Sequence, residues 1–242
     1  MVYPRTTMPT VIRRVIPATT VGAYLVRGSE SGQPAPLLVG FHGYGGSAEG
    51  CLEDLERIPG SEDLVIAAVQ ALHRFYDRKH DAVVGSWMTR LDREQAIADN
   101  ERYVASVVAA LRADVEQDGR VVYLGFSQGA AMAYRAAARG ASRAAGVIAL
   151  GGDVPPDVSD DPGVELPPVL IGRGRDDDWY TEEKVAQDLT RLRARHAAVE
   201  HVRFEGGHEW TEAFRETAGK FLRRVVPLSG RGQSSGVTGP RP

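Results

Sequence analysis

Residues 120–136 read RVVYLGFSQGAAMAYRA, and this stretch decides the fold. The apolar run Val121–Phe126 is typical of a buried strand, and the alanine-rich run Gln128–Arg139 predicts a helix. Between them, Gly125-Phe126-Ser127-Gln128-Gly129 matches G-x-S-x-G, a sharp turn from a strand into a helix. Its glycines stand where larger side chains would clash. The stretch therefore predicts a strand and a helix joined by a turn that exposes Ser127 as a nucleophile.

The rest of the chain repeats this alternation of short apolar runs with longer helical patterns. Further buried strands are expected at Leu37–Phe41, Leu64–Val69, Gly146–Leu150, Pro168–Ile171 and Val202–Phe204. Further helices are expected at Asp99–Glu116, Thr181–His196 and Glu209–Val226. The alternation predicts an α/β fold in a single domain, with a mostly parallel central sheet and helices on both of its faces.

The two ends of the chain differ from this pattern. Val11–Ile16 and Val21–Val26 are β-rich runs separated by Pro17-Ala18-Thr19-Thr20, which predicts an antiparallel pair of strands at the edge of the sheet. The last residues are rich in Gly, Ser and Pro and cannot bury enough apolar surface to offset the entropy of ordering. We therefore expect a folded domain over residues 1–226 and a disordered tail over residues 227–242.

Composition and charge narrow the class of protein. The 242 residues are 43% hydrophobic and 25% charged, which is typical of a soluble globular domain, and a net charge of −3 provides no basic excess for binding nucleic acid. The single cysteine, Cys51, excludes an internal disulfide and a zinc site built from several cysteines. Met1–Arg14 lacks the apolar stretch of a signal peptide, and no later run of about 18 apolar residues could span a bilayer. We expect a cytoplasmic monomer or homodimer that acts on a small molecule.

A nucleophilic serine needs a histidine to take its proton and a carboxylate to orient that histidine. When such a serine lies in a G-x-S-x-G turn, the acid and then the histidine follow it along the chain. His208 fits best, because it follows the expected strand Val202–Phe204 through a glycine-containing loop and directly precedes a helix. The acid is expected after Pro168–Ile171, where Asp176, Asp177 and Asp178 stand in a row. Composition does not choose among these three.

The same aspartates have a second interpretation, since Asp176-x-Asp178 has the spacing of some divalent-metal motifs. No third ligand and no nucleotide-binding loop accompany them. We therefore expect neither a metal nor a cofactor.

A second glycine-rich segment, His42-Gly43-Tyr44-Gly45-Gly46, follows the expected strand Leu37–Phe41. It resembles the HG-x-G oxyanion loops of α/β-hydrolases, whose glycines let backbone N–H groups approach a negatively charged oxygen. The expected donors are the backbone N–H groups of Tyr44 and of Gln128, the residue after the serine. His42 is expected to shape the loop rather than to act as a base.

Together, Ser127, the glycine loop and His208 resemble the phospholipase/carboxylesterase family of α/β-hydrolases, which includes the acyl-protein thioesterases. The resemblance runs roughly from Pro36 to Val226 and implies the α/β-hydrolase fold. In that family the acid lies three residues after a glycine and three before an apolar residue. Gly174, Asp177 and Tyr180 match this pattern, so the resemblance selects Asp177 as the acid.

The block from Gly85-Ser-Trp-Met-Thr89 to Asp99-Asn100 is also similar to bacterial members of this family, in which the segment before the helix borders the substrate site. The resemblance makes four residues candidates for the acyl or alcohol pocket: Trp87, Met88, Trp179 and Tyr180. Each could equally be a packing residue, because Trp and Tyr are commonly buried with their polar end satisfied.

The resemblance implies a serine hydrolase that cleaves carboxylic esters, or thioesters, of small to medium acyl groups through an acyl-enzyme intermediate. Three positions depart from many family members, which have Leu at Tyr44, Asp at Gly46 and Pro at Asp178. Peptidases and lactone hydrolases use the same fold and remain alternatives. So does a non-catalytic receptor that keeps the pocket for a small molecule.

Overall fold

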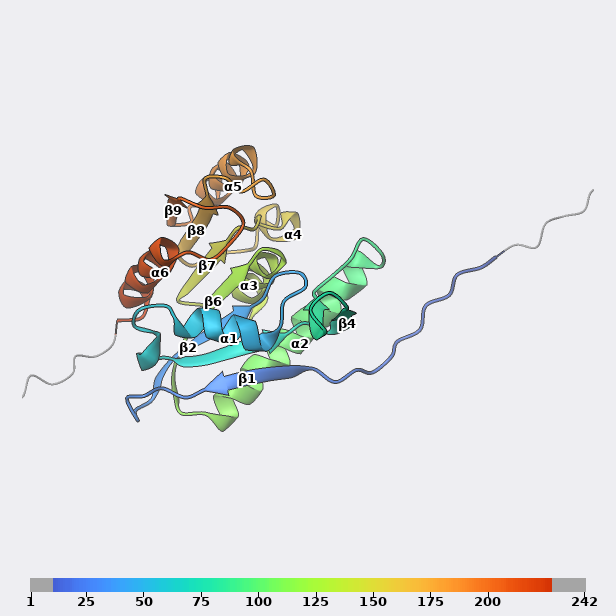
Figure 1. Ribbon diagram of the computed structural model, residues 1–242, viewed down its shortest axis with the longest axis horizontal. Coiled ribbons are helices and arrows are strands. Elements are labelled where there is room, and N and C mark those ends of the chain that lie inside the picture. The colour runs from blue at the N-terminus through green and yellow to red at the C-terminus, as the bar shows by residue number, and fades with distance from the viewer. Residues whose placement is uncertain (1–10, 228–242) are drawn as a thin grey trace, which may run out of the picture.

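The computed structural model describes residues 11–227, and a sheet of seven strands forms the centre of the molecule (Figure 1). In spatial order the strands are β1 (Ala23–Arg27), β3 (Val65–Gln70), β2 (Ala35–Phe41), β6 (Gln117–Phe126), β7 (Gly146–Leu150), β8 (Val169–Gly174) and β9 (Val199–Phe204). Neighbouring strands are parallel, except that β1 runs antiparallel to β3 at one edge. The prediction of a mostly parallel sheet is confirmed.

Helices cover both faces of this sheet. One face packs against α1 (Ala48–Glu56) and α6 (Glu212–Val225), and the other against α2 (Arg93–Asp114), α3 (Gln128–Arg139) and α5 (Glu182–Ala194). Two hydrophobic clusters result, because successive side chains of a strand point to opposite faces. In β2, for example, Leu37 and Val39 belong to the cluster under α2 and α3, whereas Leu38 belongs to the cluster under α1 and α6.

Four smaller or weakly patterned elements are absent from the sequence-based expectations. They are helix α1, the 3₁₀ turn η1 (Ser61–Asp63), the short helix α4 (Pro156–Ser159) and the hairpin of β4 (His73–Asp77) and β5 (Ala82–Ser86). Helix α1 buries only Ala48, Cys51 and Leu55, so its apolar stripe is short. The hairpin is mostly exposed along β4 and therefore carries little of the apolar alternation that marks a strand.

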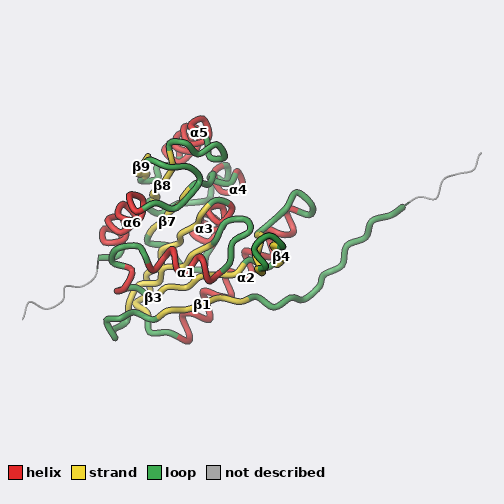
Figure 2. Tube along the Cα trace, in the orientation of Figure 1, coloured by secondary structure: helices red, strands yellow, loops and turns green. Residues whose placement is uncertain are grey.

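The predicted strand at Val11–Ile16 is wrong. Figure 2 draws the described residues before β1 as an extended loop, and the side chains of Val11 and Ile16 are 94% and 82% exposed. Only the second predicted strand is present, as β1, and it pairs with β3 instead of forming a hairpin. β-branched residues favour a strand when they pack against neighbours, and nothing among the described residues covers Val11–Ile16.

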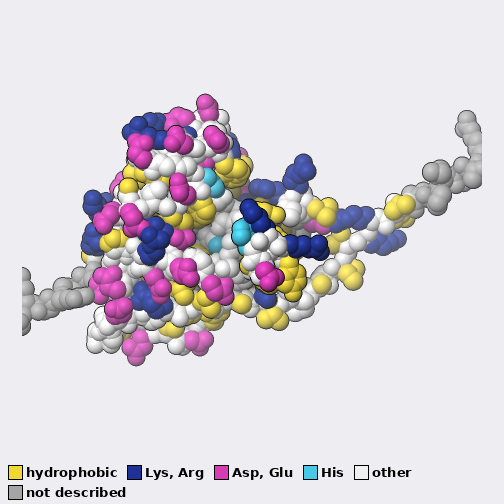
Figure 3. Space-filling model, in the orientation of Figure 1, with side chains coloured by type: hydrophobic (Ala, Val, Ile, Leu, Met, Phe, Trp, Pro, Cys, Tyr) yellow, Lys and Arg dark blue, Asp and Glu magenta, His cyan; other side chains and the backbone are white. Residues whose placement is uncertain are grey.

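The last helix of the described residues, α6, ends at Val225. The tail predicted for residues 227–242 lies outside the described residues, apart from Pro227. Acidic and basic side chains are interspersed over the face seen in Figure 3. Within residues 11–227 we find no helix that is both long and apolar enough to cross a membrane.

Candidate active site

Ser127 occupies the turn between β6 and α3 in a backbone conformation that is rare for residues other than glycine. Its φ is 54° and its ψ is −121°. The turn is fixed on both sides, because the Ser127 N–H donates to the Leu150 carbonyl at 2.8 Å and the Ala130 N–H donates to the Ser127 carbonyl at 3.0 Å. A strained residue held this firmly is typical of a functional site.

The two glycines of G-x-S-x-G are required by close backbone contacts. A Cβ atom on Gly125 would lie 2.1 Å from the carbonyl oxygen of Gly129. A Cβ atom on Gly129 would lie 2.1 Å from the carbonyl oxygen of Phe41, at the end of β2. The absence of side chains therefore lets α3 begin directly against the neighbouring strand.

We expect Gly129→Ala to lower the free energy of unfolding by at least about 3 kcal/mol, because backbone atoms cannot move aside as a flexible side chain can. Urea unfolding followed by circular dichroism measures this loss. Gly50→Ala is the matched control, since a Cβ atom there would meet nothing closer than the Ser47 hydroxyl at 3.9 Å. Equal midpoints for the two variants would contradict the steric argument.

Three predicted residues from three loops meet in one chain of hydrogen bonds. His208 Nε2 lies 2.8 Å from Ser127 Oγ, and His208 Nδ1 lies 2.8 Å from Asp177 Oδ2. Asp177 follows β8, and His208 follows β9. Because these strands run parallel to β6, their carboxyl ends bring all three side chains to the same edge of the sheet.

Of the three consecutive aspartates, only Asp177 points into the protein. It is 2% exposed, and its second oxygen, Oδ1, accepts hydrogen bonds from the N–H groups of Trp179 at 2.9 Å and Tyr180 at 2.7 Å. Asp176 and Asp178 are exposed and form no contact with His208. Two backbone donors therefore fix the Asp177 carboxylate at the angle that His208 requires.

The loop that holds Asp177 is tied to the body of the protein by a buried guanidinium. Arg173, at the end of β8, donates from Nε to the Tyr180 carbonyl at 2.7 Å and from Nη2 to the Asp177 carbonyl at 3.3 Å. These bonds close the loop from both ends. They keep the carboxylate in place before any substrate binds.

His42 shapes the glycine-rich loop after β2. Its Nδ1 lies 2.7 Å from the Gly43 carbonyl, and its Nε2 accepts from the Ala71 N–H at 3.1 Å, which defines a neutral ring with the proton on Nδ1. Burial lowers the pKa of His42, in keeping with that neutral state. Both ring nitrogens are engaged with the backbone, so His42 has no nitrogen available as a base.

The two backbone N–H groups predicted to bind an oxyanion belong to Tyr44 and Gln128. Within residues 11–227, neither donates a hydrogen bond. The Tyr44 side chain lies outside the loop, 66% exposed, with its ring 5.5 Å from the ring of Phe75. The Gln128 side chain is engaged elsewhere, since its Oε1 accepts from the Trp87 N–H at 2.7 Å and its Nε2 donates to the Met88 carbonyl at 2.8 Å.

A cavity of about 350 Å³ opens at Ser127. Met88 and Trp179, two of the four predicted pocket residues, line it together with Thr89, Arg90, Arg93, Gln128, Ala131, Asp153, Val154, Pro155 and Pro156. Arg90 and Arg93 lie in the segment that was expected to border the substrate site, but neither was named as a candidate.

Direct contact of Trp87 and Tyr180 with a substrate is contradicted by their burial, as both side chains are 0% exposed. Trp87 instead donates from its indole N–H to the His42 carbonyl at 2.8 Å and packs edge-on against Phe41. The Tyr180 hydroxyl lies 2.9 Å from Asp188 Oδ2. Trp87 and Tyr180 therefore lie beneath the residues that line the cavity and pack against them.

Asp188, on α5, is a buried carboxyl group beneath the Asp177 loop. It is 2% exposed and accepts from the Val154 N–H at 3.0 Å and from the Tyr180 hydroxyl. Burial raises its pKa to about 6. Val154 lines the cavity at Ser127, and Tyr180 belongs to the loop that holds Asp177, so the Asp188 carboxyl group links the cavity wall to that loop.

The raised pKa of Asp188 predicts a pH dependence of stability. The buried carboxyl group is more favourable protonated than ionised, so the folded state binds its proton more tightly than the unfolded state, in which the pKa is about 3.9. Its contribution to the free energy of unfolding is therefore fully present below about pH 3.9 and is lost as the pH rises through about 6. We expect Asp188→Asn, which cannot ionise, to lose less stability than the wild type between pH 4.5 and pH 7. Urea midpoints at the two pH values test this. Parallel losses in both proteins would contradict the assignment.

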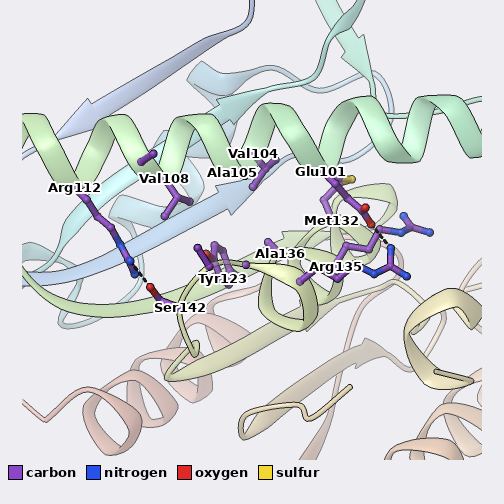
Figure 4. A pocket seen from close by; sticks show the side chains of 14 residues that line it. Glu101, Val104, Ala105, Val108, Arg112, Tyr123, Met132, Arg135, Ala136 and Ser142 are labelled. Atoms are coloured by element: carbon purple, nitrogen blue, oxygen red, sulfur yellow. Dashed lines mark hydrogen bonds and ion pairs between the residues drawn. The ribbon is translucent and has the colours of Figure 1, made fainter. Parts of the chain in front are cut away.

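Two other features do not contribute to this site. Among residues 11–227, no group of three His, Cys, Asp or Glu side chains is arranged to hold a metal ion. A second cavity, of about 150 Å³, lies between α2 and α3, with Arg112 and Ser142 at one end and Glu101 and Arg135 at the other (Figure 4). None of the predicted site residues lines that cavity.

Comparison with known proteins agrees with this fold. The model of the phospholipase/carboxylesterase family matches residues 26–226. No curated protein matches the chain. Among solved structures, esterase PE8 has a TM-score of 0.70 at 24% identity, over 86% of this chain and 100% of that one. The Bacillus cereus carboxylesterase has a TM-score of 0.66 at 18% identity, over 85% and 95% of the two chains.

Zea mays acyl-protein thioesterase 2 has a TM-score of 0.65 at 17% identity, over 85% of this chain and 99% of that one. At these identities the structural likenesses establish the α/β-hydrolase fold. The family match spans most of the chain and therefore also establishes the family. The chain belongs to the phospholipase/carboxylesterase family and is a hydrolase of the carboxylesterase and thioesterase type.

Proposed function

We propose that this protein is a serine esterase that hydrolyses carboxylic esters or thioesters of small to medium acyl groups through an acyl-enzyme intermediate. The observation that carries the proposal is the unbroken series of hydrogen bonds from Ser127 through His208 to Asp177. Each partner is of the chemical type that nucleophilic acyl transfer needs.

In the first half of the reaction, Ser127 Oγ attacks the carbonyl carbon while His208 Nε2 takes its proton. Asp177 holds the proton on His208 Nδ1 and stabilises the imidazolium that forms. His208 then donates its proton to the departing alcohol or thiol. In the second half, water attacks the acyl-enzyme with His208 again as the base, and the carboxylic acid leaves.

The negative charge that develops on the carbonyl oxygen is bound by the N–H groups of Tyr44 and Gln128. Each such donor is worth on the order of 10²–10³ in rate, and the general base contributes roughly 10²–10⁴. The strained turn at Ser127 and the close approach of Gly43, where an added Cβ atom would lie 3.2 Å from Ser127 Cβ, support this role.

The size of the acyl group follows from the cavity at Ser127. Its volume of about 350 Å³ is at the lower end for small-molecule sites. Trp179, Met88 and Val154 give it apolar surface, which favours a short or medium acyl chain over a polar peptide segment. A small-molecule ester remains the expected partner and the cytoplasm the expected location.

Hydrolysis of p-nitrophenyl acetate, butyrate and octanoate, combined with fluorophosphonate labelling, tests the proposal. We expect turnover that is fastest with the shorter acyl groups and is abolished by stoichiometric labelling of the peptide that contains Ser127. Labelling without turnover of any ester would favour a peptidase or lactone hydrolase. Absence of both labelling and turnover would favour a receptor that retains the pocket.

A further inference from the structure

Two arginines lie on the wall of the cavity that contains Ser127. Arg90 precedes α2, Arg93 is its first residue, and both side chains are exposed. Within residues 11–227, neither guanidinium forms an ion pair or a hydrogen bond. Several other arginines of this chain are ion-paired, such as Arg135 with Asp157 at 2.7 Å, and the unpaired Arg143 does not line this cavity.

The charge of these two arginines is not balanced within the cavity. Asp153 is the one acidic residue on the cavity wall, and its Oδ2 lies 4.0 Å from Nζ of Lys184. Lys184 also stands over the ring of Trp179, 4.2 Å from its centroid, and thus adds positive charge beside the same wall. The cavity lining therefore carries two arginines against one aspartate, while Asp92, which is paired with Arg13, and Glu94 line the adjoining hollow on the far side of the same arginines.

Arg93 is not positioned to stabilise the helix that it begins. A cation in the first turn faces the positive end of the helix dipole, which is unfavourable. Asp92, the residue before it, makes no capping hydrogen bond with its side chain and is ion-paired with Arg13 instead. A residue that breaks a local stability rule inside a cavity is a candidate for binding.

We propose that the substrate of this enzyme carries a carboxylate and that Arg90 and Arg93 bind it while Ser127 attacks the ester carbonyl. This inference rests on the proposed esterase function. A carboxylate offers two oxygens to the donors of guanidinium groups, and arginine matches that geometry better than lysine does. The carboxylate can belong to the acyl group, as in a half-ester of a dicarboxylic acid, or to the alcohol.

Two matched pairs of esters distinguish these sources. On the acyl side, mono-p-nitrophenyl glutarate is compared with p-nitrophenyl pentanoate, which has the same number of acyl carbons and no charge. On the alcohol side, 4-acetoxybutanoate is compared with butyl acetate. In at least one pair we expect the wild type to favour the anionic ester in kcat/KM, and we expect rising NaCl concentration to reduce that preference because the arginines are exposed.

In the double variant Arg90→Gln/Arg93→Gln, we expect the ratio of kcat/KM for the anionic ester to that for the neutral ester to fall about tenfold. The matched control is Arg143→Gln. Arg143 is an exposed arginine without a partner among the described residues, and it lies before β7, at the opposite end of the sheet from Ser127. This control should keep the wild-type ratio.

A binding measurement separates this proposal from the esterase proposal. Glutarate should quench tryptophan fluorescence at a lower concentration than pentanamide, an uncharged compound of the same chain length, through Trp179 in the cavity wall, and the double variant should lose the difference. If the esters are hydrolysed but the ratios do not change in the double variant, the carboxylate site is wrong and the esterase function stands. If no ester is hydrolysed, the esterase proposal is wrong, and equal binding of glutarate and pentanamide would overturn the carboxylate site as well.

Discussion

Ser127→Ala should lower kcat for p-nitrophenyl butyrate by about 10⁴-fold or more, which leaves only the residual catalysis that substrate binding and the oxyanion donors provide. The variant lacks the oxygen that forms the acyl-enzyme, and His208 Nε2 then has no hydroxyl at 2.8 Å from which to take a proton. The backbone amides of Tyr44 and Gln128 would remain, so weak binding of substrate should persist. Initial rates, corrected for the background hydrolysis of the ester, measure this loss of kcat.

The fold of this variant should be intact, since alanine removes only the hydroxyl from the turn. Circular dichroism and the urea midpoint provide the check. A second replacement, Ser127→Gly, should be equally inactive but more stable by roughly 1 kcal/mol, because glycine adopts a φ of 54° without strain. Substantial activity in a folded Ser127→Ala protein would remove Ser127 as the nucleophile.

Asp177→Asn should lower kcat by about 10⁴-fold, whereas Asp176→Asn and Asp178→Asn should change it by less than about threefold. Asparagine keeps an oxygen that can accept from the N–H groups of Trp179 and Tyr180, so the loop should hold its shape. The amide then faces His208 Nδ1 with its NH₂ group, which favours the wrong tautomer of the imidazole.

The two neighbouring aspartates are close controls, because the three substitutions remove the same charge from adjacent positions. Inactivity of Asp176→Asn or Asp178→Asn, with an active Asp177→Asn, would move the acid to that position.

The fold was largely predictable because its strands are buried on both faces. Runs such as Leu37–Phe41 are continuous and apolar, and they alternate with helices whose inner faces are amphipathic. Val11–Ile16 has the same residue types without the packing, so composition alone gave the wrong answer there. The hairpin β4–β5 was not predicted for the opposite reason, since β4 forms a strand with little burial.

The candidate site was predictable where local geometry determines it. Ser127 and His208 were identified from a strand, a glycine-rich turn and a helix, all of which are readable within a few residues. The choice of Asp177 needed the family resemblance, because only the folded loop turns one of three equal aspartates inward. The burial of Trp87 depends on His42, 45 positions earlier in the chain, and no local pattern encodes that contact.

Gln128 gives this enzyme an unusual constraint on how its substrate range can change. Its main-chain N–H is one of the two proposed oxyanion donors, while its side chain anchors the backbone of Trp87 and Met88 at the cavity wall. Under the proposed mechanism, a mutation that reshapes the wall at Met88 also displaces a residue that binds the transition state. Laboratory evolution of acyl preference should meet this coupling at Met88, and a second one at Trp179, whose N–H holds Asp177 and whose ring lies 5.5 Å from that of His208.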